Sequence, residues 1–76
     1  MNLTPREFQI LETLAARRGE AVSRDDLVAR IWGTAEHVVV STRTVDQHVA
    51  GLRRKLEAGG ASIIETVYGH GYRLAP

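Results

Sequence analysis

The chain has 76 residues, of which 43% are hydrophobic and 25% charged, with no cysteine and a formal net charge of +1. This length and this balance of residues suit one small folded domain and argue against a disordered chain. The missing cysteines exclude disulfides and thiolate metal sites, and no apolar run reaches the roughly 20 residues of a membrane span or resembles a signal peptide. We therefore expect a single cytoplasmic domain over residues 1–76 that does not contact membranes.

The first predicted helix covers about residues 4–18. Thr4 is a suitable N-cap, Pro5 suits the first helical position, and Glu7 completes a capping box. Gly19 ends the helix. Its apolar face is expected to consist of Phe8, Ile10, Leu11, Leu14 and Ala15.

The second predicted helix covers about residues 23–32. Ser23 is its expected N-cap, Asp26 completes a second capping box, and Gly33 ends the helix. The inward-facing residues are Leu27, Val28 and Ile31. Residues 20–22, just before this helix, are sufficient for a brief strand only.

The third predicted helix covers about residues 42–58 and is capped by Ser41 or Thr42. Its apolar residues recur at i, i+4, i+7 and i+11, the period of one helix face. These are Val45, Val49, Leu52 and Leu56.

The basic charge of the chain is concentrated on this third helix. Residues 1–40 hold five arginines and six acidic residues, giving −1, whereas residues 41–76 hold five cations and three acidic residues, giving +2. Within residues 41–56, four cations against one acidic residue give +3. Basic charge gathered on one element indicates a nucleic-acid partner.

The outer face of the third helix is expected to carry polar, small and cationic residues. They are Arg43, Thr44, Asp46, Gln47, Ala50, Gly51, Arg54 and Lys55. Small or hydrogen-bonding residues flanked by cations suit a helix in the major groove of DNA, and an ordinary solvated helix is the alternative. A glycine inside a helix costs about 1 kcal/mol relative to alanine, so Gly51 indicates that something large comes close to this face.

Two β segments around Gly69 and Gly71 predict a hairpin over about residues 63–74, with both glycines at positive φ. A phosphate-binding loop would have to open a helix, and none follows here. A catalytic His70 would need a partner, and the chain has no HExxH or GxSxG motif. We therefore expect no enzyme, cofactor or metal, and a hairpin with His70 and Tyr68 exposed at its tip.

Four segments together resemble the DNA-binding effector domain of OmpR/PhoB-type response regulators. They are LTPREFQILETLA, VSRDDLVARIWG, STRTVDQHVAGLRRKLE and IETVYGHGYRL, within Leu3 to Leu74. The resemblance implies a mainly α fold with a small β-sheet (α+β), a three-helix winged helix-turn-helix whose C-terminal hairpin is the wing. It also implies sequence-specific binding of double-stranded DNA in a two-component regulatory system, with the third helix in the major groove and the wing at the minor groove.

The resemblance further implies individual DNA contacts. Phosphate contacts fall on Arg43, Thr44, His48 and Arg53, and also on Trp32, for which a place in the core is equally compatible. Base edges are faced by Asp46, Ala50 and Gly51, and the wing contacts are Thr66 and Tyr68. Some members have arginines where this chain has Ala50 and Gly51, and many have a wing arginine where it has Tyr68, so His70 or Arg73 would partly substitute. Tyr72 is expected to pack the wing onto the core.

Two further partners follow from the resemblance. Residues 33–41 correspond to a loop that touches RNA polymerase in some members, with a plain connector as the alternative. The family domain begins with a four-stranded sheet that this chain is expected to lack, together with the receiver domain. The exposed face of the first helix would then favour self-association.

Two other classes of function stay open at this point. The fold could be a winged-helix protein-interaction module that does not read DNA, which the modest net charge favours. Alternatively, the same DNA-binding domain could belong to a membrane sensor or to a large activator.

Overall fold

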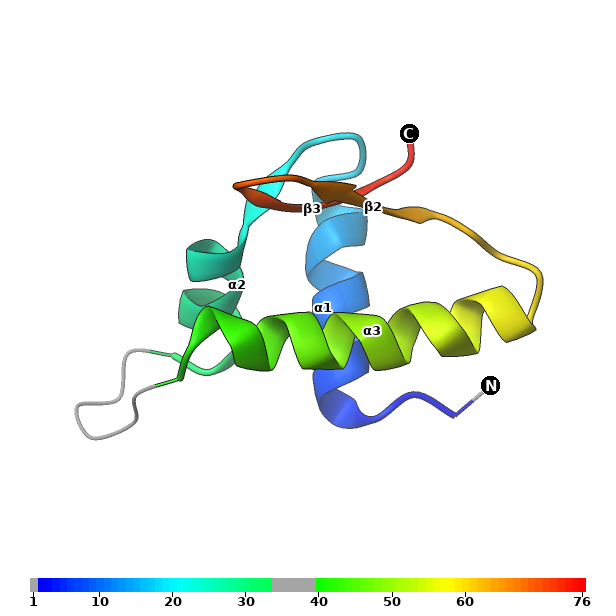
Figure 1. Ribbon diagram of the computed structural model, residues 1–76, viewed down its shortest axis with the longest axis horizontal. Helices are drawn as coiled ribbons and strands as arrows, with labels where there is room; N and C mark the ends of the chain where they lie inside the picture. Colours follow the sequence, from blue (N-terminus) through cyan, green and yellow to red (C-terminus); the bar gives the residue numbers. More distant parts are fainter. Residues whose placement is uncertain (1, 34–39) are drawn as a thin grey trace.

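The computed structural model describes residues 2–33 and 40–76 (Figure 1). Its elements in chain order are α1 (Pro5–Ala16), β1 (Val22–Ser23), α2 (Arg24–Ile31), α3 (Thr42–Ala58), β2 (Ile64–Val67) and β3 (Gly71–Leu74). The three predicted helices and the C-terminal hairpin are all present, and the mainly α class with a small sheet is confirmed. The first two helices end earlier than predicted, at Ala16 and Ile31.

The three strands form one antiparallel sheet in the order β1-β3-β2. Tyr72 of β3 lies between its partners, opposite Val22 of β1 and Thr66 of β2. In Figure 1, α1 crosses α3, α2 lies beside both, and the sheet covers the C-terminal end of α1. The short strand before α2 therefore ties the hairpin to the helices.

The two glycines of the hairpin have different roles. Gly69 has a φ of 75°, and the Val67 carbonyl accepts a hydrogen bond from His70 N–H at 3.0 Å. A residue at the third position of a type II turn needs such a φ. Gly71 is not among the glycines with positive φ, so the prediction for this residue is wrong. A Cβ at Gly71 would lie 2.0 Å from the Val22 carbonyl oxygen, so the absence of a side chain at this position lets β1 pack beside β3.

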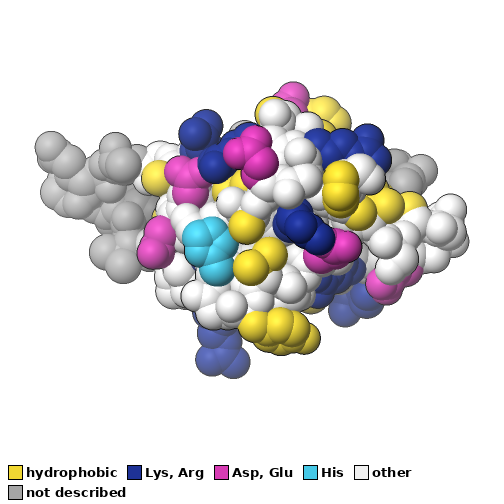
Figure 2. Space-filling view, turned by 90° about the horizontal axis from the view of Figure 1, so that it is seen from above, with side chains coloured by type: hydrophobic (Ala, Val, Ile, Leu, Met, Phe, Trp, Pro, Cys, Tyr) yellow, Lys and Arg dark blue, Asp and Glu magenta, His cyan; other side chains and the backbone are white. Residues whose placement is uncertain are grey.

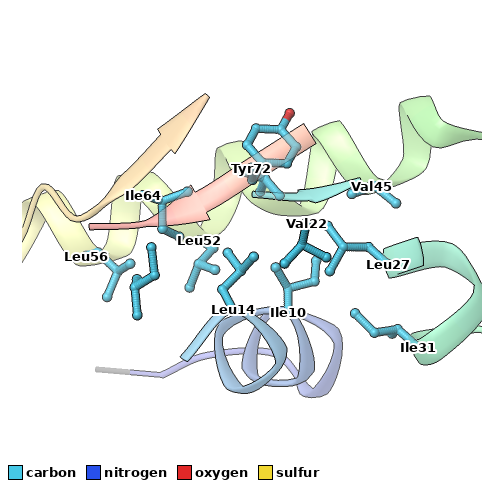
Figure 3. Packing of buried hydrophobic residues seen from close by; sticks show 12 residues of the cluster. Ile10, Leu14, Val22, Leu27, Ile31, Val45, Leu52, Leu56, Ile64 and Tyr72 are labelled. Atoms are coloured by element: carbon cyan, nitrogen blue, oxygen red, sulfur yellow. The ribbon is translucent and has the colours of Figure 1, made fainter. Parts of the chain in front are cut away.

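One apolar core joins the three helices and the sheet (Figure 3). Ile10 and Leu14 of α1 and Leu52 of α3 have no exposed surface. Each fully buried aliphatic side chain of this size contributes about 1.5–3 kcal/mol. The other members are Val22, Leu27, Ile31, Val45, Val49, Leu56, Ile64, Tyr72 and Leu74.

The helix caps follow the sequence only in part. The capping box of α1 is present, with Thr4 Oγ1 accepting from Glu7 N–H at 3.2 Å and Glu7 Oε1 accepting from Thr4 N–H at 2.9 Å. In α2, Ser23 Oγ accepts from Asp26 N–H at 3.0 Å. The Asp26 carboxylate pairs with Arg17, just after α1, and with Arg30 of α2 instead of completing the predicted box. Ser41 occupies the N-cap position of α3 without a side-chain cap hydrogen bond.

The apolar face of α1 is only partly buried in the core. Ile10 and Leu14 are buried, whereas Phe8 is 54% exposed. Phe8 lies in an open groove of about 830 Å³, whose other lining residues are Asn2, Leu3, Pro5, Leu11 and Leu56. Phe8 is therefore an exposed member of the apolar face predicted on α1. None of the described helices is both long and apolar enough to cross a lipid bilayer.

Candidate nucleic-acid interface

One exposed stripe runs along α3, opposite its buried stripe. It consists of Arg43, Gln47, Ala50 and Arg54, which recur at i, i+4, i+7 and i+11. The buried residues Val45, Val49, Leu52 and Leu56 have the same spacing two residues later. The face of α3 that is open to solvent is therefore narrower than the eight residues predicted.

Gly51 and Lys55 both contact Glu7 of α1, and Lys55 stays partly exposed. Gly51 is buried, and a Cβ on it would lie 2.7 Å from Glu7 Oε2. Lys55 Nζ lies 2.6 Å from Glu7 Oε1, and Glu7 is only 5% exposed. The prediction that Gly51 stands on the outer face of α3 is wrong, since this glycine is buried and makes room for the Glu7 carboxylate.

The Glu7 carboxylate is charged despite its burial. The hydrogen bond from Lys55 lowers the pKa of Glu7 below its ordinary value of 4.5, and desolvation opposes this shift. The Thr4 backbone N–H lowers the pKa further. Glu7, which completes the capping box of α1, therefore also forms the ion pair that joins α1 to α3.

Asp46 joins three elements. Its Oδ2 accepts a hydrogen bond from Arg24 Nη1 of α2 at 3.0 Å, and its Oδ1 accepts one from the Tyr72 hydroxyl of β3 at 2.6 Å. Burial and this hydrogen bond raise the pKa of Tyr72 to about 12. The Asp46 carboxylate, assigned to base edges by resemblance, is bound to protein groups in the free domain. The predicted packing of Tyr72 onto the core is confirmed, since it is 8% exposed.

Arg53 and Thr66, two predicted DNA contacts, bind each other. Arg53 Nη2 donates to Thr66 Oγ1 at 2.7 Å, and Arg53 Nε donates to the Ile64 carbonyl at 3.2 Å. The guanidinium of Arg53 also lies 5.4 Å from the ring centroid of Tyr72. Arg53 therefore fastens β2 to α3 and is partly withdrawn from solvent.

Trp32 lies between a cation and a histidine. The guanidinium of Arg6 is 5.0 Å from the Trp32 ring centroid, and the His48 ring lies at 5.4 Å with a tilt of 46°. Trp32, His48 and Thr44 are all half-buried, so each combines core packing with an accessible edge.

The tip of the wing is open to solvent. Tyr68 is 92% exposed and His70 is also exposed. Arg73 pairs instead with Glu65 across the two strands, with Nε 2.7 Å from Oε1. Of the two suggested substitutes for a wing arginine, His70 is therefore the one at the tip.

Figure 2 views the molecule from the side of the sheet, where cationic and acidic side chains lie next to one another instead of forming one basic patch. The cations on the exposed stripe are Arg43 and Arg54, and neither has an ion-pair partner among the residues that the structure describes. The sequence reasoning assigned no role to Arg24 or to a buried Glu7 pair. No local signal marks them, because their partners are 22 and 48 residues away.

Comparison with known proteins identifies close relatives. The chain is 44% identical over 75 residues to the transcriptional regulatory protein BaeR of Escherichia coli O6:H1, covering 96% of this chain and 30% of BaeR. It is 38% identical over 76 residues to the phosphate regulon transcriptional regulatory protein PhoB of Escherichia coli K12, covering 99% of this chain and 32% of PhoB. The chain thus spans about a third of the length of these relatives.

A solved structure supports the same relationship. The crystal structure of the response regulator AdeR DNA-binding domain, in complex with an intercistronic region, superposes with a TM-score of 0.87 and 32% identity. The match covers 100% of this chain and 74% of that one. Residues 1–74 also match the family described as "Transcriptional regulatory protein, C terminal", a family of regulators and not of enzymes. The chain therefore belongs to this family of C-terminal domains of transcriptional regulatory proteins, and it has the winged-helix fold of the OmpR/PhoB-type response regulators.

Proposed function

We propose that this domain binds double-stranded DNA sequence-specifically, as the cytoplasmic effector domain of a two-component response regulator. The exposed stripe of α3 carries the proposal. Arg43 and Arg54 bracket Gln47 and Ala50, and their offset of 11 positions corresponds to about 16 Å along the helix axis. An α-helix fits the major groove, which is about 12 Å wide, with its cations on the flanking phosphates.

The remaining contacts have supporting rather than leading roles. Thr44, His48 and Trp32 lie half-buried beside the stripe, where an accessible edge would meet a phosphate. Tyr68 and His70 would meet the minor groove from the wing tip. We assign Asp46, Arg53 and Thr66 mainly to holding α3 and the wing in register, because each is already bound within the protein.

The test is enrichment of a random duplex library on the purified chain at two salt concentrations. We expect salt-sensitive retention and a recovered motif of direct repeats spaced by about one helical turn. Retention without a motif would contradict sequence reading while leaving backbone binding. No retention at low salt would contradict DNA binding by this domain.

A protein-interaction module is the second candidate. The net charge of +1 favours it, as does the internal pairing of Arg53 and Lys55, which leaves two open arginines on α3. Retention on heparin at low salt separates the two functions. A DNA-binding domain should be retained and released by salt, whereas an interaction module of this charge should pass through.

Self-association is proposed through the exposed α1 face, with a second copy of this chain covering Phe8. Sedimentation velocity should show a concentration-dependent dimer that Phe8→Ser abolishes and that Ala29→Ser, at an exposed position of α2, preserves. A monomer at all concentrations would contradict this proposal.

Contact with RNA polymerase through residues 33–41 is also retained as a proposal. Most of that segment, residues 34–39, lies outside the described part of the chain. The proposal therefore rests on the family relationship alone, and cross-linking of the full regulator to the polymerase tests it.

A further inference from the structure

The middle of the exposed stripe holds two uncharged side chains, Gln47 and Ala50. Three other polar residues of α3 are bound within the protein. Asp46 is bound to Arg24 and Tyr72, Arg53 to β2, and Lys55 to Glu7. Gly51 is buried beneath the Glu7 carboxylate. Gln47 and Ala50 are the exposed residues between the two arginines, so they would meet base edges while Arg43 and Arg54 lie toward the phosphates.

The spacing of the two residues matches neighbouring base pairs. Residues at i and i+3 lie side by side on a helix, with Cβ atoms about 5–6 Å apart. Successive base pairs are about 3.4 Å apart along the duplex. Gln47 and Ala50 would thus face positions one or two base pairs apart.

The two side chains differ in chemistry, so each should favour a different base. A glutamine amide donates to N7 and accepts from N6–H of adenine at the same time, and a small apolar side chain contacts the methyl group of thymine. Arginine at such positions would instead select guanine. A site read by Gln47 and Ala50 should therefore be A·T at its centre.

The helix that presents these side chains is held from two sides. The Glu7–Lys55 pair fixes α3 against α1, and the Asp46–Tyr72 hydrogen bond fixes it against the wing. These contacts do not involve Gln47 or Ala50. Substituting either residue should therefore change the base preference without changing how α3 is held.

We propose that Gln47 reads adenine and that Ala50 admits thymine one or two base pairs away, which makes these two residues the specificity determinants of α3. This inference rests on the proposed DNA binding. It commits to a base identity that DNA binding alone does not require.

The test is library enrichment on four forms of the chain: wild type, Gln47→Ala, Gln47→Glu and the control Gln9→Glu. Gln9 is exposed on α1, so the control makes the same chemical change away from the stripe. Wild type should prefer adenine at one position by about 5-fold to 150-fold, the range of a bidentate contact. Gln47→Ala should remove this preference, and Gln47→Glu should replace adenine by cytosine, whose N4 amino group donates to a carboxylate.

Ala50→Arg provides a second, independent readout. It should convert a thymine preference to guanine one or two base pairs from the adenine position. Far-UV circular dichroism and thermal unfolding of each variant verify that the fold is intact.

The outcomes separate this inference from the proposed function. A wild-type motif that survives both Gln47 substitutions would overturn the inference and leave DNA reading in place. Retention on DNA without any motif would also overturn it, while backbone binding would stand. A complete absence of retention would overturn both.

Discussion

The carboxylate of Glu7 and the ammonium of Lys55 lie 2.6 Å apart, although 48 residues separate them in the chain. Glu7 is also the residue that completes the capping box at the start of α1. One side chain thus starts the first helix and fixes the third against it. Gly51, one turn before Lys55, leaves the space in which this carboxylate lies.

Because Gly51 packs against Glu7, the effect of Gly51→Ala on the free energy of unfolding should change sign when Glu7 is removed. Alanine is favoured over glycine inside a helix by about 1 kcal/mol. In the wild type, Gly51→Ala should nevertheless lower the free energy of unfolding by about 1 kcal/mol, because the new Cβ displaces a buried, hydrogen-bonded carboxylate. In a Glu7→Ala background, the same substitution should raise that free energy by about 1 kcal/mol.

Urea unfolding of the four proteins of this cycle measures both effects. If Gly51→Ala stabilised both backgrounds equally, the contact with Glu7 would not constrain position 51. The glycine would then need another explanation, such as close approach of DNA.

Acid should weaken the domain through Glu7. The pKa of Glu7 is lowered in the fold from its ordinary value of 4.5, mainly by Lys55. A carboxyl group with a depressed folded pKa contributes stability that is present above its unfolded pKa and is lost as pH falls through the folded pKa. The free energy of unfolding should therefore fall as pH drops below 4.5.

Urea unfolding at a series of acidic pH values tests this in Glu7→Gln, which should lose less stability on acidification than wild type. Glu12→Gln, exposed on the same helix, is the control and should follow the wild type. Equal slopes in all three proteins would show that Glu7 does not govern acid sensitivity.

Alkaline pH should act on the opposite side of α3, through Tyr72. Its pKa is raised from 10.0 to about 12 by burial and by the bond to Asp46. A raised folded pKa means that the contribution is complete below pH 10 and is lost as pH rises toward 12. Absorbance at the tyrosinate band, wild type minus Tyr72→Phe, should titrate near 12.

Tyr72→Phe should also cost about 1.5–3 kcal/mol at neutral pH, because it removes a hydrogen bond to a charged group. Asp46→Asn keeps an acceptor but removes the charge, so it should lower the pKa of Tyr72. An unchanged tyrosinate midpoint in Asp46→Asn would contradict the assigned pair.

The two open arginines of α3 should govern the salt dependence of DNA binding. Each phosphate contact adds about 0.9 to the magnitude of the slope of log K against log salt concentration. Arg43→Ala and Arg54→Ala should each reduce that slope by about 1, with a uniform loss of affinity across sequences. Fluorescence anisotropy on one duplex at several salt concentrations measures this slope for each variant.

Arg18→Ala is the matched control, since Arg18 is exposed at the end of α1 and donates to the Ala75 carbonyl. Its slope should equal that of the wild type. A slope that fell equally in all three variants would indicate a diffuse charge effect and not a defined stripe.

Much of the fold follows from the sequence alone. Three features depend on residues that are close together in the chain: the capping box at Thr4, the apolar period of α3 and the turn at Gly69. Hydrogen bonding at a helix start, helical periodicity and positive φ are local physical requirements, so a single sequence is sufficient to recognise them. The same holds for the family, whose motifs are continuous segments.

Only the tertiary structure decided which polar residues of α3 remain open. The eight candidates are all small, polar or charged, and nothing local separates Gly51 and Lys55, which contact Glu7, from Gln47 and Arg54, which face solvent. Asp46, Arg53 and Lys55 are bound within the protein, and their partners lie on α1, α2 and the wing, 11 to 48 residues away. Their pairing depends on how the elements pack, because a buried carboxylate or hydroxyl takes whichever donor or acceptor the packing brings within reach.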